Sequence, residues 1–238
     1  MFVFCLVAVF ESSLFPQSIL SEHQFNPAAL YQQQFGIIAS TGVNFGLSEL
    51  KTYSLYSQIK SYSICITTFG NELYRENIIG LGFGFPFIKH FAVGFNISML
   101  NYSIKDHYNH FGFSLKFGAL FQHTPFDLGV WINNINVPKF SDIDYIPASY
   151  SIQCGFRAAD NVLFNFIIRG IETDLPFFNI AAHYYPYNIF ELALGVNTDP
   201  LLLEYGLKIH LGDLCLGYAG THHRQLGLSH RLSAGFGL

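Results

Sequence analysis

Apolar and polar residues alternate along most of this chain, from about Phe35 to the last residue. In residues 201–212, every second residue is apolar: Leu201, Leu203, Tyr205, Leu207, Ile209 and Leu211. The residues between them include Glu204, Lys208 and His210. Successive side chains of a β-strand point to opposite faces, so this period of two predicts strands with one apolar face and one polar face.

The same alternation recurs between short turn sequences along the chain. Connections such as Asn71-Glu72, Asp199-Pro200 and Gly212-Asp213 contain the residues that tight turns favour. Counting the segments between such turns predicts about fourteen strands. Their ranges are 35–46, 50–59, 61–70, 76–86, 90–104, 108–121, 126–137, 146–157, 161–171, 177–185, 189–197, 200–211, 214–222 and 226–238.

Composition places these strands in a membrane. The chain has 238 residues, of which 50% are hydrophobic and only 12% are charged, about half the charged share of a soluble domain. It contains no run of about 18 uncharged apolar residues, the length that a spanning helix needs. Without such helices, only a closed barrel pairs every backbone group inside a bilayer. We therefore predict an all-β, transmembrane, antiparallel up-and-down β-barrel over residues 35–238.

The register of the alternation predicts which residues face lipid. Leu203, Leu207, Phe113 and Phe117 should point outward into the apolar band of the barrel. The first strand should pair with the last, because an unpaired strand edge is costly in lipid.

The first 34 residues lack this alternation. Phe2–Phe10 is a short apolar core of the length found in signal peptides, so residues 1–11 predict export through a cleaved signal peptide to the bacterial outer membrane. Residues 12–34 carry apolar side chains and the motif Asn26-Pro27-Ala28. We expect them to form a short N-terminal hatch inside the lumen, with space left by the inward glycines Gly80, Gly82, Gly84 and Gly112.

Polar residues on the lumen face are the candidate site residues. They are Lys116, Arg157, Arg169, His183, Glu204, Lys208, His210 and Arg231, with Asp127 in the same register of its own strand. A wide barrel must hydrate such groups or pair them with a plug. Most of them are basic, which favours anionic or amphipathic carboxylate ligands, and ordinary hydration of the lumen is the alternative interpretation.

No pattern in the sequence predicts an enzyme, a metal site or a cofactor. Cys5, Cys65, Cys154 and Cys215 are scattered, without a CxxC motif. His222 and His223 are adjacent, so on a strand they face opposite sides, and a polar turn is the simpler interpretation. The run from Gly80 to Gly84 lacks dinucleotide-binding spacing.

The sequence also contains no motif that predicts catalysis or nucleic-acid binding. The nucleophile motif G-x-S-x-G is absent, and a lipase with a Ser/His pair on the wall stays open as an alternative. The net charge of −4 brings no basic patch that would suit nucleic acid.

Three stretches resemble a known family. They are Phe25-Asn26-Pro27-Ala28-Ala29-Leu30, the run Ile146-Pro147-Ala148-Ser149 before a strand with Gly155, and the C-terminal stretch from Leu216 to Arg231. They are similar to segments of PorV/PorQ-like outer-membrane proteins, which are related to FadL-type fatty-acid transporters.

The resemblance implies a function and partners. It implies that Asn26, Pro27 and Ala28 form the hatch motif of a monomeric, non-enzymatic barrel in outer-membrane lipid. In the PorV/PorQ reading, the barrel is an accessory to type IX-like protein secretion or envelope export, with secretion-system proteins as partners. In the alternative, FadL-like reading, it transports a hydrophobic or amphipathic small molecule.

Overall fold

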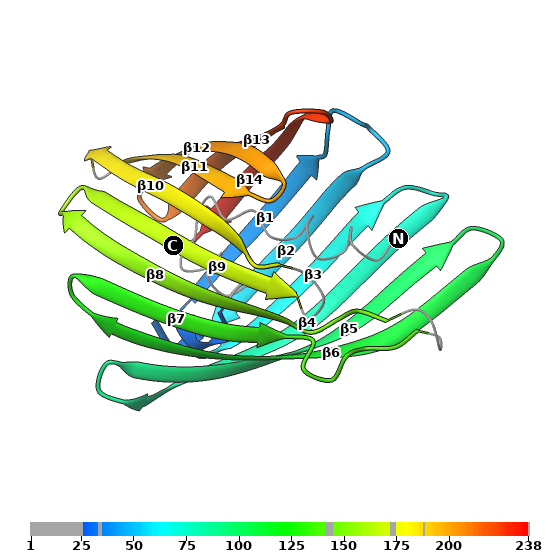
Figure 1. The fold of residues 1–238 in the computed structure, drawn as a ribbon, viewed down its shortest axis with the longest axis horizontal. Coiled ribbons are helices and arrows are strands. Elements are labelled where there is room, and N and C mark those ends of the chain that lie inside the picture. The colour runs from blue at the N-terminus through cyan, green and yellow to red at the C-terminus, as the bar shows by residue number, and fades with distance from the viewer. Residues whose placement is uncertain (1–25, 33–34, 141–144, 172–174, 188, 238) are drawn as a thin grey trace.

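Fourteen antiparallel strands close into one barrel (Figure 1). The computed structural model describes residues 26–32, 35–140, 145–171, 175–187 and 189–237. One short 3-10 helix, η1 (Pro27–Gln32), precedes the strands. The strands are β1 (Phe35–Val43), β2 (Lys51–Ile59), β3 (Tyr62–Gly70), β4 (Tyr74–Ile88), β5 (Phe91–Ile104), β6 (Tyr108–His123), β7 (Phe126–Asn133), β8 (Ser149–Ala159), β9 (Val162–Ile171), β10 (Phe177–Tyr187), β11 (Phe190–Thr198), β12 (Leu201–Leu211), β13 (Leu214–His223) and β14 (Gly227–Phe236).

Each strand pairs with the next in the chain, and β14 pairs with β1. The predicted strand number, the up-and-down order and the closure of the first strand onto the last are therefore confirmed. At this seam, Ser40 lies opposite Ser233 and Gly42 lies opposite Arg231. Closure leaves no edge whose backbone groups would face lipid unpaired. The fold is that of an outer-membrane β-barrel.

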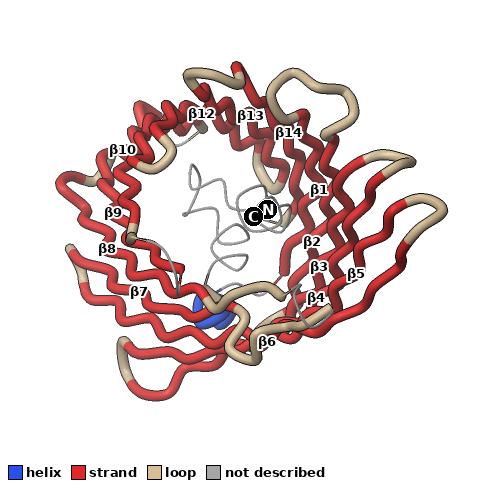
Figure 2. The backbone as a smooth tube through the Cα atoms, turned by 45° about the vertical axis from the view of Figure 1, so that its right-hand side comes forward, coloured by secondary structure: helices blue, strands red, loops and turns tan. Residues whose placement is uncertain are grey.

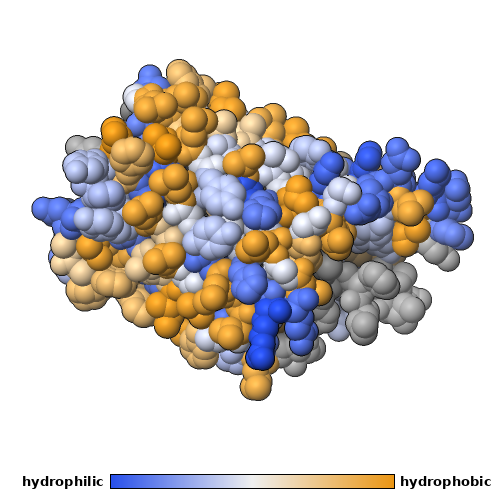
Figure 3. All heavy atoms as spheres, turned by 90° about the horizontal axis from the view of Figure 1, so that it is seen from above, coloured by the Kyte–Doolittle hydropathy of each residue, from blue (hydrophilic) through white to orange (hydrophobic). Residues whose placement is uncertain are grey.

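The outer surface of the wall is apolar, as the alternation predicts. Phe113 is 61% exposed, Leu203 is 52% exposed, and Phe117 and Leu207 also face outward. Figure 3 shows apolar side chains over much of one face, with polar ones gathered on the part that projects to the right. Residues between the outward ones, such as Glu204 and Lys208, are buried on the inner side. Strand register thus places apolar groups toward lipid and polar groups toward the lumen.

The two ends of the barrel differ in the length of their connections. At the end where β1 begins and β14 ends, two residues separate the strands of each hairpin, for example 60–61, 124–125 and 212–213. The other end carries the longer connections, including 44–50 and 134–148. Short turns are the periplasmic connections of outer-membrane barrels. The chain termini of the wall therefore mark its periplasmic end.

The longest connection, residues 134–148, begins earlier than the sequence predicts. The expected strand over 126–137 ends at Asn133, because Asn134 adopts a left-handed conformation with φ of 54°. The Asn134 side chain then accepts a hydrogen bond from Ser114 and donates one to the carbonyl of Pro147. These bonds hold the base of the connection against the wall.

The described parts of this connection turn inward. The ring of Phe140 meets that of Tyr102 edge-on, with centroids 4.9 Å apart, and lies against Gly112. Ile146 is buried against Leu100. The interior at the extracellular end is thus partly filled by the barrel's own loop. Among the described residues, no helix is long and apolar enough to cross a membrane.

Candidate functional site in the lumen

The helix η1 lies inside the barrel against β4, β5 and β6, as Figure 2 shows by its place within the ring of strands. Its side of the wall is lined by glycines. A Cβ atom added to Gly94 would collide with the Pro27 carbonyl and lie 2.5 Å from the nitrogen of Ala28. A Cβ on Gly84 would lie 2.6 Å from the Pro27 oxygen. These glycines let the backbone of η1 approach the wall closely.

The motif Asn26-Pro27-Ala28 fixes the start of η1. The Asn26 side chain accepts a hydrogen bond from the Ala28 amide at 3.0 Å and donates one to the Ala119 carbonyl of β6 at 2.9 Å. Asparagine is a favoured cap residue, and Pro27 in the first helical position has no amide hydrogen left without an acceptor. One side chain therefore both caps the helix and ties it to the wall.

Two further hydrogen bonds hold the rest of η1. Gln58 of β2 donates from Nε2 to the Leu30 carbonyl at 2.6 Å, and Tyr31 donates its hydroxyl to Gln122 of β6 at 2.8 Å. Residues 26–30 are almost completely buried, with Ala28 at 0% exposure. The described part of the expected hatch is therefore a seated element of the lumen. Within the expected hatch, only residues 26–32 are described. The rest of residues 12–34 and the expected signal peptide, residues 1–11, lie outside the described residues.

Of the four inward glycines that were expected to leave space for the hatch, two contact η1. Gly82 and Gly84 do face η1, through Leu30 and Pro27. Gly80 faces the side chains of Cys65 and Ser98, and Gly112 faces Phe140. The seat also uses three glycines that sequence reasoning passed over: Gly94, Gly118 and Gly129.

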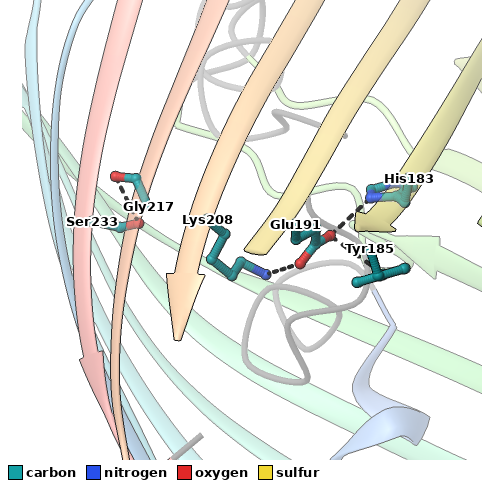
Figure 4. Close-up of polar contacts among 6 residues, drawn as sticks. All are labelled: His183, Tyr185, Glu191, Lys208, Gly217 and Ser233. Atoms are coloured by element: carbon teal, nitrogen blue, oxygen red, sulfur yellow. Dashed lines mark hydrogen bonds and ion pairs between the residues drawn. The ribbon is translucent and has the colours of Figure 1, made fainter. Parts of the chain in front are cut away.

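A charged cluster lies on the inner face of β10, β11 and β12 (Figure 4). Glu191 is its centre. One carboxylate oxygen accepts a hydrogen bond from His183 Nδ1 at 2.9 Å, and the other forms an ion pair with Lys208 Nζ at 3.0 Å. The Tyr185 hydroxyl also donates to Glu191 at 3.4 Å. The side chains of His183, Glu191 and Lys208 are each at most 5% exposed.

This ion pair changes how the charged residues of the lumen are interpreted. His183 and Lys208 were expected to face a hydrated lumen or an anionic ligand. Lys208 is instead neutralised by Glu191, directly opposite it in the strand register. A buried ion pair stays stable only with such geometry and added hydrogen bonds. The ammonium group of Lys208 therefore interacts with a residue of the barrel wall.

The other candidate lumen residues do not join one site. Glu204 accepts a hydrogen bond from Asn179 at 3.1 Å, nearer the extracellular end of the same strands. Arg169 is buried on β9, and His210 lies one inward position beyond Lys208 on β12. The remaining candidates lie on other parts of the wall: Lys116 on β6, Asp127 on β7, Arg157 on β8 and Arg231 on β14.

Sequence reasoning missed Glu191 and Asn165. Glu191 lies in the same alternation as the inward residues Ala193, Gly195 and Asn197 of β11, so its inward direction could have been recognised. The partners of Glu191 could not, because they depend on the stagger between three strands. Asn165 is a polar residue in an otherwise apolar segment of β9.

The described part of the chain shows no cluster of side chains that would bind a metal ion. Within that part, no group of three or more His, Cys, Asp or Glu side chains converges as a metal site. His222 lies opposite the outward Leu203, whereas His223 accepts two backbone hydrogen bonds, from Gln225 and Leu226, in the β13–β14 turn. Cys65, Cys154 and Cys215 are free thiols on three separate strands.

Comparison with known proteins finds relatives in fold alone. No protein-family model matches the chain, and no curated protein matches its sequence. Among solved structures, the CymD monoaromatic hydrocarbon channel matches with a TM-score of 0.65 and 12% identity, over 94% of this chain and 93% of that one. The Ralstonia pickettii toluene transporter TbuX matches with a TM-score of 0.62 and 10% identity, over 91% and 92%.

A third similar structure is a Pseudomonas aeruginosa FadL homologue. Its TM-score is 0.61 at 11% identity, with 94% of this chain and 95% of that chain covered. Identities this low establish the shared barrel architecture. They do not transfer a substrate.

Proposed function

We propose that this protein is a FadL-like transporter that passes hydrophobic or amphipathic small molecules through its lumen. The observation that carries the proposal is the Asn26-Pro27-Ala28 helix seated inside a closed fourteen-stranded barrel. A barrel with an internal element conducts selectively, because solutes must pass between that element and the wall. Structures with similar folds are a monoaromatic hydrocarbon channel and a toluene transporter.

The lumen chemistry supports the same proposal. Buried apolar side chains, among them Leu163, Ile167 and Trp131, alternate in the lumen with buried polar ones. The lysine of the charged cluster is already paired with Glu191, so its charge does not favour an anionic solute. Such a lining suits solutes that carry a large apolar part.

The secretion-accessory reading rests on the resemblance of sequence motifs to PorV/PorQ-like proteins. The comparisons favour the transporter reading instead. One of those motifs, the run from Ile146 to Ser149 before the strand with Gly155, also has a local structural explanation. Ile146 anchors the inward loop on Leu100, and Gly155 leaves space beside Asn165.

Toluene uptake tests the proposal. The full chain is expressed in Gram-negative cells whose lipopolysaccharide layer slows hydrocarbon entry, and uptake of radiolabelled toluene is compared with that of cells carrying an empty vector. Uptake should rise several-fold. Equal uptake, with the folded barrel present in the outer membrane, would contradict the transporter reading.

A matched pair of variants shows whether the lumen is the route. Ala193 faces the lumen at 2% exposure, and its neighbour Leu194 faces outward at 68% exposure. Ala193→Trp should abolish most of the added uptake, whereas Leu194→Trp should leave it unchanged. Migration on unheated gels, where folded barrels run differently from unfolded ones, confirms that both variants fold.

A further inference from the structure

Two inward side chains on neighbouring strands carry polar atoms that meet no partner among the described residues. Asn165 of β9 is 1% exposed, and neither its amide nitrogen nor its amide oxygen is hydrogen-bonded within that part of the chain. His183 of β10 is 0% exposed, and its Nε2 atom likewise has no hydrogen-bond partner among the described residues. A buried polar atom without a partner costs about 1–3 kcal/mol, so such atoms point to a ligand.

The two residues lie close together on the inner face of neighbouring strands. Asn165 is opposite Ala181 in the register, and His183 lies two residues beyond Ala181 on the same face. Such diagonal neighbours are about 7–8 Å apart between Cα atoms. This spacing is compatible with one oxygen atom that bridges the two side chains.

The charged cluster determines which kind of hydrogen bond His183 can make. The Glu191 carboxylate can only accept, so the proton of the imidazole lies on Nδ1, where the two groups meet at 2.9 Å. Lys208 already balances the charge of Glu191. In the tautomer that carries its proton on Nδ1, the Nε2 atom has a lone pair and requires a donor.

Apolar side chains also lie beside this pair. Leu163 is opposite His183 in the register, and Ile167 follows Asn165 at the next inward position of β9. Ile167 packs against Trp131 of β7 in a buried cluster. The pair thus offers one donor–acceptor point beside an apolar surface.

We propose that Asn165 and His183 bind the hydroxyl group of a neutral amphiphile, an alcohol or a phenol, whose apolar body lies on Leu163, Ile167 and Trp131. This inference rests on the proposed transport function and names its substrate class. A hydroxyl donates to His183 Nε2 and accepts from the Asn165 amide. A pure hydrocarbon leaves both without a partner, and a carboxylate brings no donor for Nε2. The site therefore favours a class other than the carboxylates that the sequence suggests.

The test compares p-cresol with p-xylene, which differ only by a hydroxyl in place of a methyl group. Binding to the purified full chain is followed through the fluorescence of Trp131, the only tryptophan of the chain. The ratio of the two Kd values is measured for the parent and for Asn165→Leu, because this double comparison cancels the different hydration of the two probes. The preference for p-cresol should fall about tenfold in Asn165→Leu.

Asn96→Leu is the matched control. Asn96 also faces the lumen, but from β5 on another part of the wall, so its removal should leave the ratio unchanged. Should Asn165→Leu fail to fold on unheated gels, Asn165→Ala takes its place. An unchanged ratio in the folded Asn165 variant, or an equal change in Asn96→Leu, would overturn the proposal.

The two proposals fail separately. If toluene uptake is established but the cresol-to-xylene ratio ignores Asn165, the hydroxyl site is wrong and transport stands. If p-cresol binds through Asn165 but no uptake is seen, the chain binds this class without transporting it. Tighter binding of p-toluate than of p-cresol would assign the site to carboxylates and would also overturn the inference.

Discussion

The seat of η1 yields a sharp prediction at Gly94. Its φ is not left-handed, so Gly94→Ala is acceptable for the strand itself, but the added methyl group would overlap the backbone of Pro27 and lie 2.5 Å from the Ala28 nitrogen. Backbone atoms cannot rotate away as side-chain ends can. Either η1 or the wall must move, and overpacking of this kind costs about 1–3 kcal/mol.

The element that moves should be η1. Gly94 lies between Gly84 and Gly118, in strands that are hydrogen-bonded on both sides around the barrel. In contrast, η1 is held against the wall by single side-chain hydrogen bonds, among them those of Asn26 to Ala119, of Gln58 to Leu30 and of Tyr31 to Gln122. Each contributes about 1 kcal/mol. Displacing η1 is therefore cheaper than breaking the wall, and the lumen should open.

Planar-bilayer conductance measures this opening directly. Gly94→Ala should raise single-channel conductance. It should also lower the urea concentration at the midpoint of unfolding, which is monitored by tryptophan fluorescence. The control is Gly155→Ala, where the added methyl group would meet Asn165 Oδ1 at 3.3 Å, a side-chain end that can rotate. Its conductance should match that of the parent. If Gly94→Ala also matches the parent in both conductance and urea midpoint, η1 is not seated as described.

Three further predictions concern the wall. Lys208→Met should destabilise the barrel by about 3 kcal/mol in urea, because it leaves the buried Glu191 carboxylate without its ion pair, and adding Glu191→Gln should recover most of the loss. Leu207→Arg should cost about 2–4 kcal/mol in the same assay by placing a charge toward lipid, and a cost near zero would refute the register. Cysteines at Ser40 and Ser233, in a background without native cysteines, should cross-link upon oxidation, and a failure to do so would contradict closure of the barrel.

Sequence reasoning predicted the fold well, because its main signal is local. The alternation that placed Phe113 and Leu207 outward and Lys208 inward needs only the two-residue period of a strand. The low charge and the lack of a spanning helix then leave the closed barrel as the form that pairs every backbone group in lipid. Asn26-Pro27-Ala28 was recognised by resemblance, since one Asn-Pro-Ala motif alone is compatible with a simple turn.

The candidate site was less predictable because it depends on distant strands. His183 and Lys208 were recognised as inward residues, but the chain separates them by two strand connections and says nothing of the shared partner Glu191. Their pairing follows from the stagger of β10, β11 and β12. Asn165 drew no attention in the sequence, because its importance comes from burial at 1% exposure beside His183.

The sequence by itself determined the period, the lipid-facing register and the closed architecture, since each follows from side-chain direction along a strand and from the need to pair backbone groups in lipid. Only the tertiary structure decided which glycines receive η1 and which lumen charges neutralise each other. Gly94 and Gly118 matter because closure brings Asn26 and Pro27 against them across the lumen. Such contacts depend on where the whole barrel places two segments in space, and no local pattern of residues carries that information.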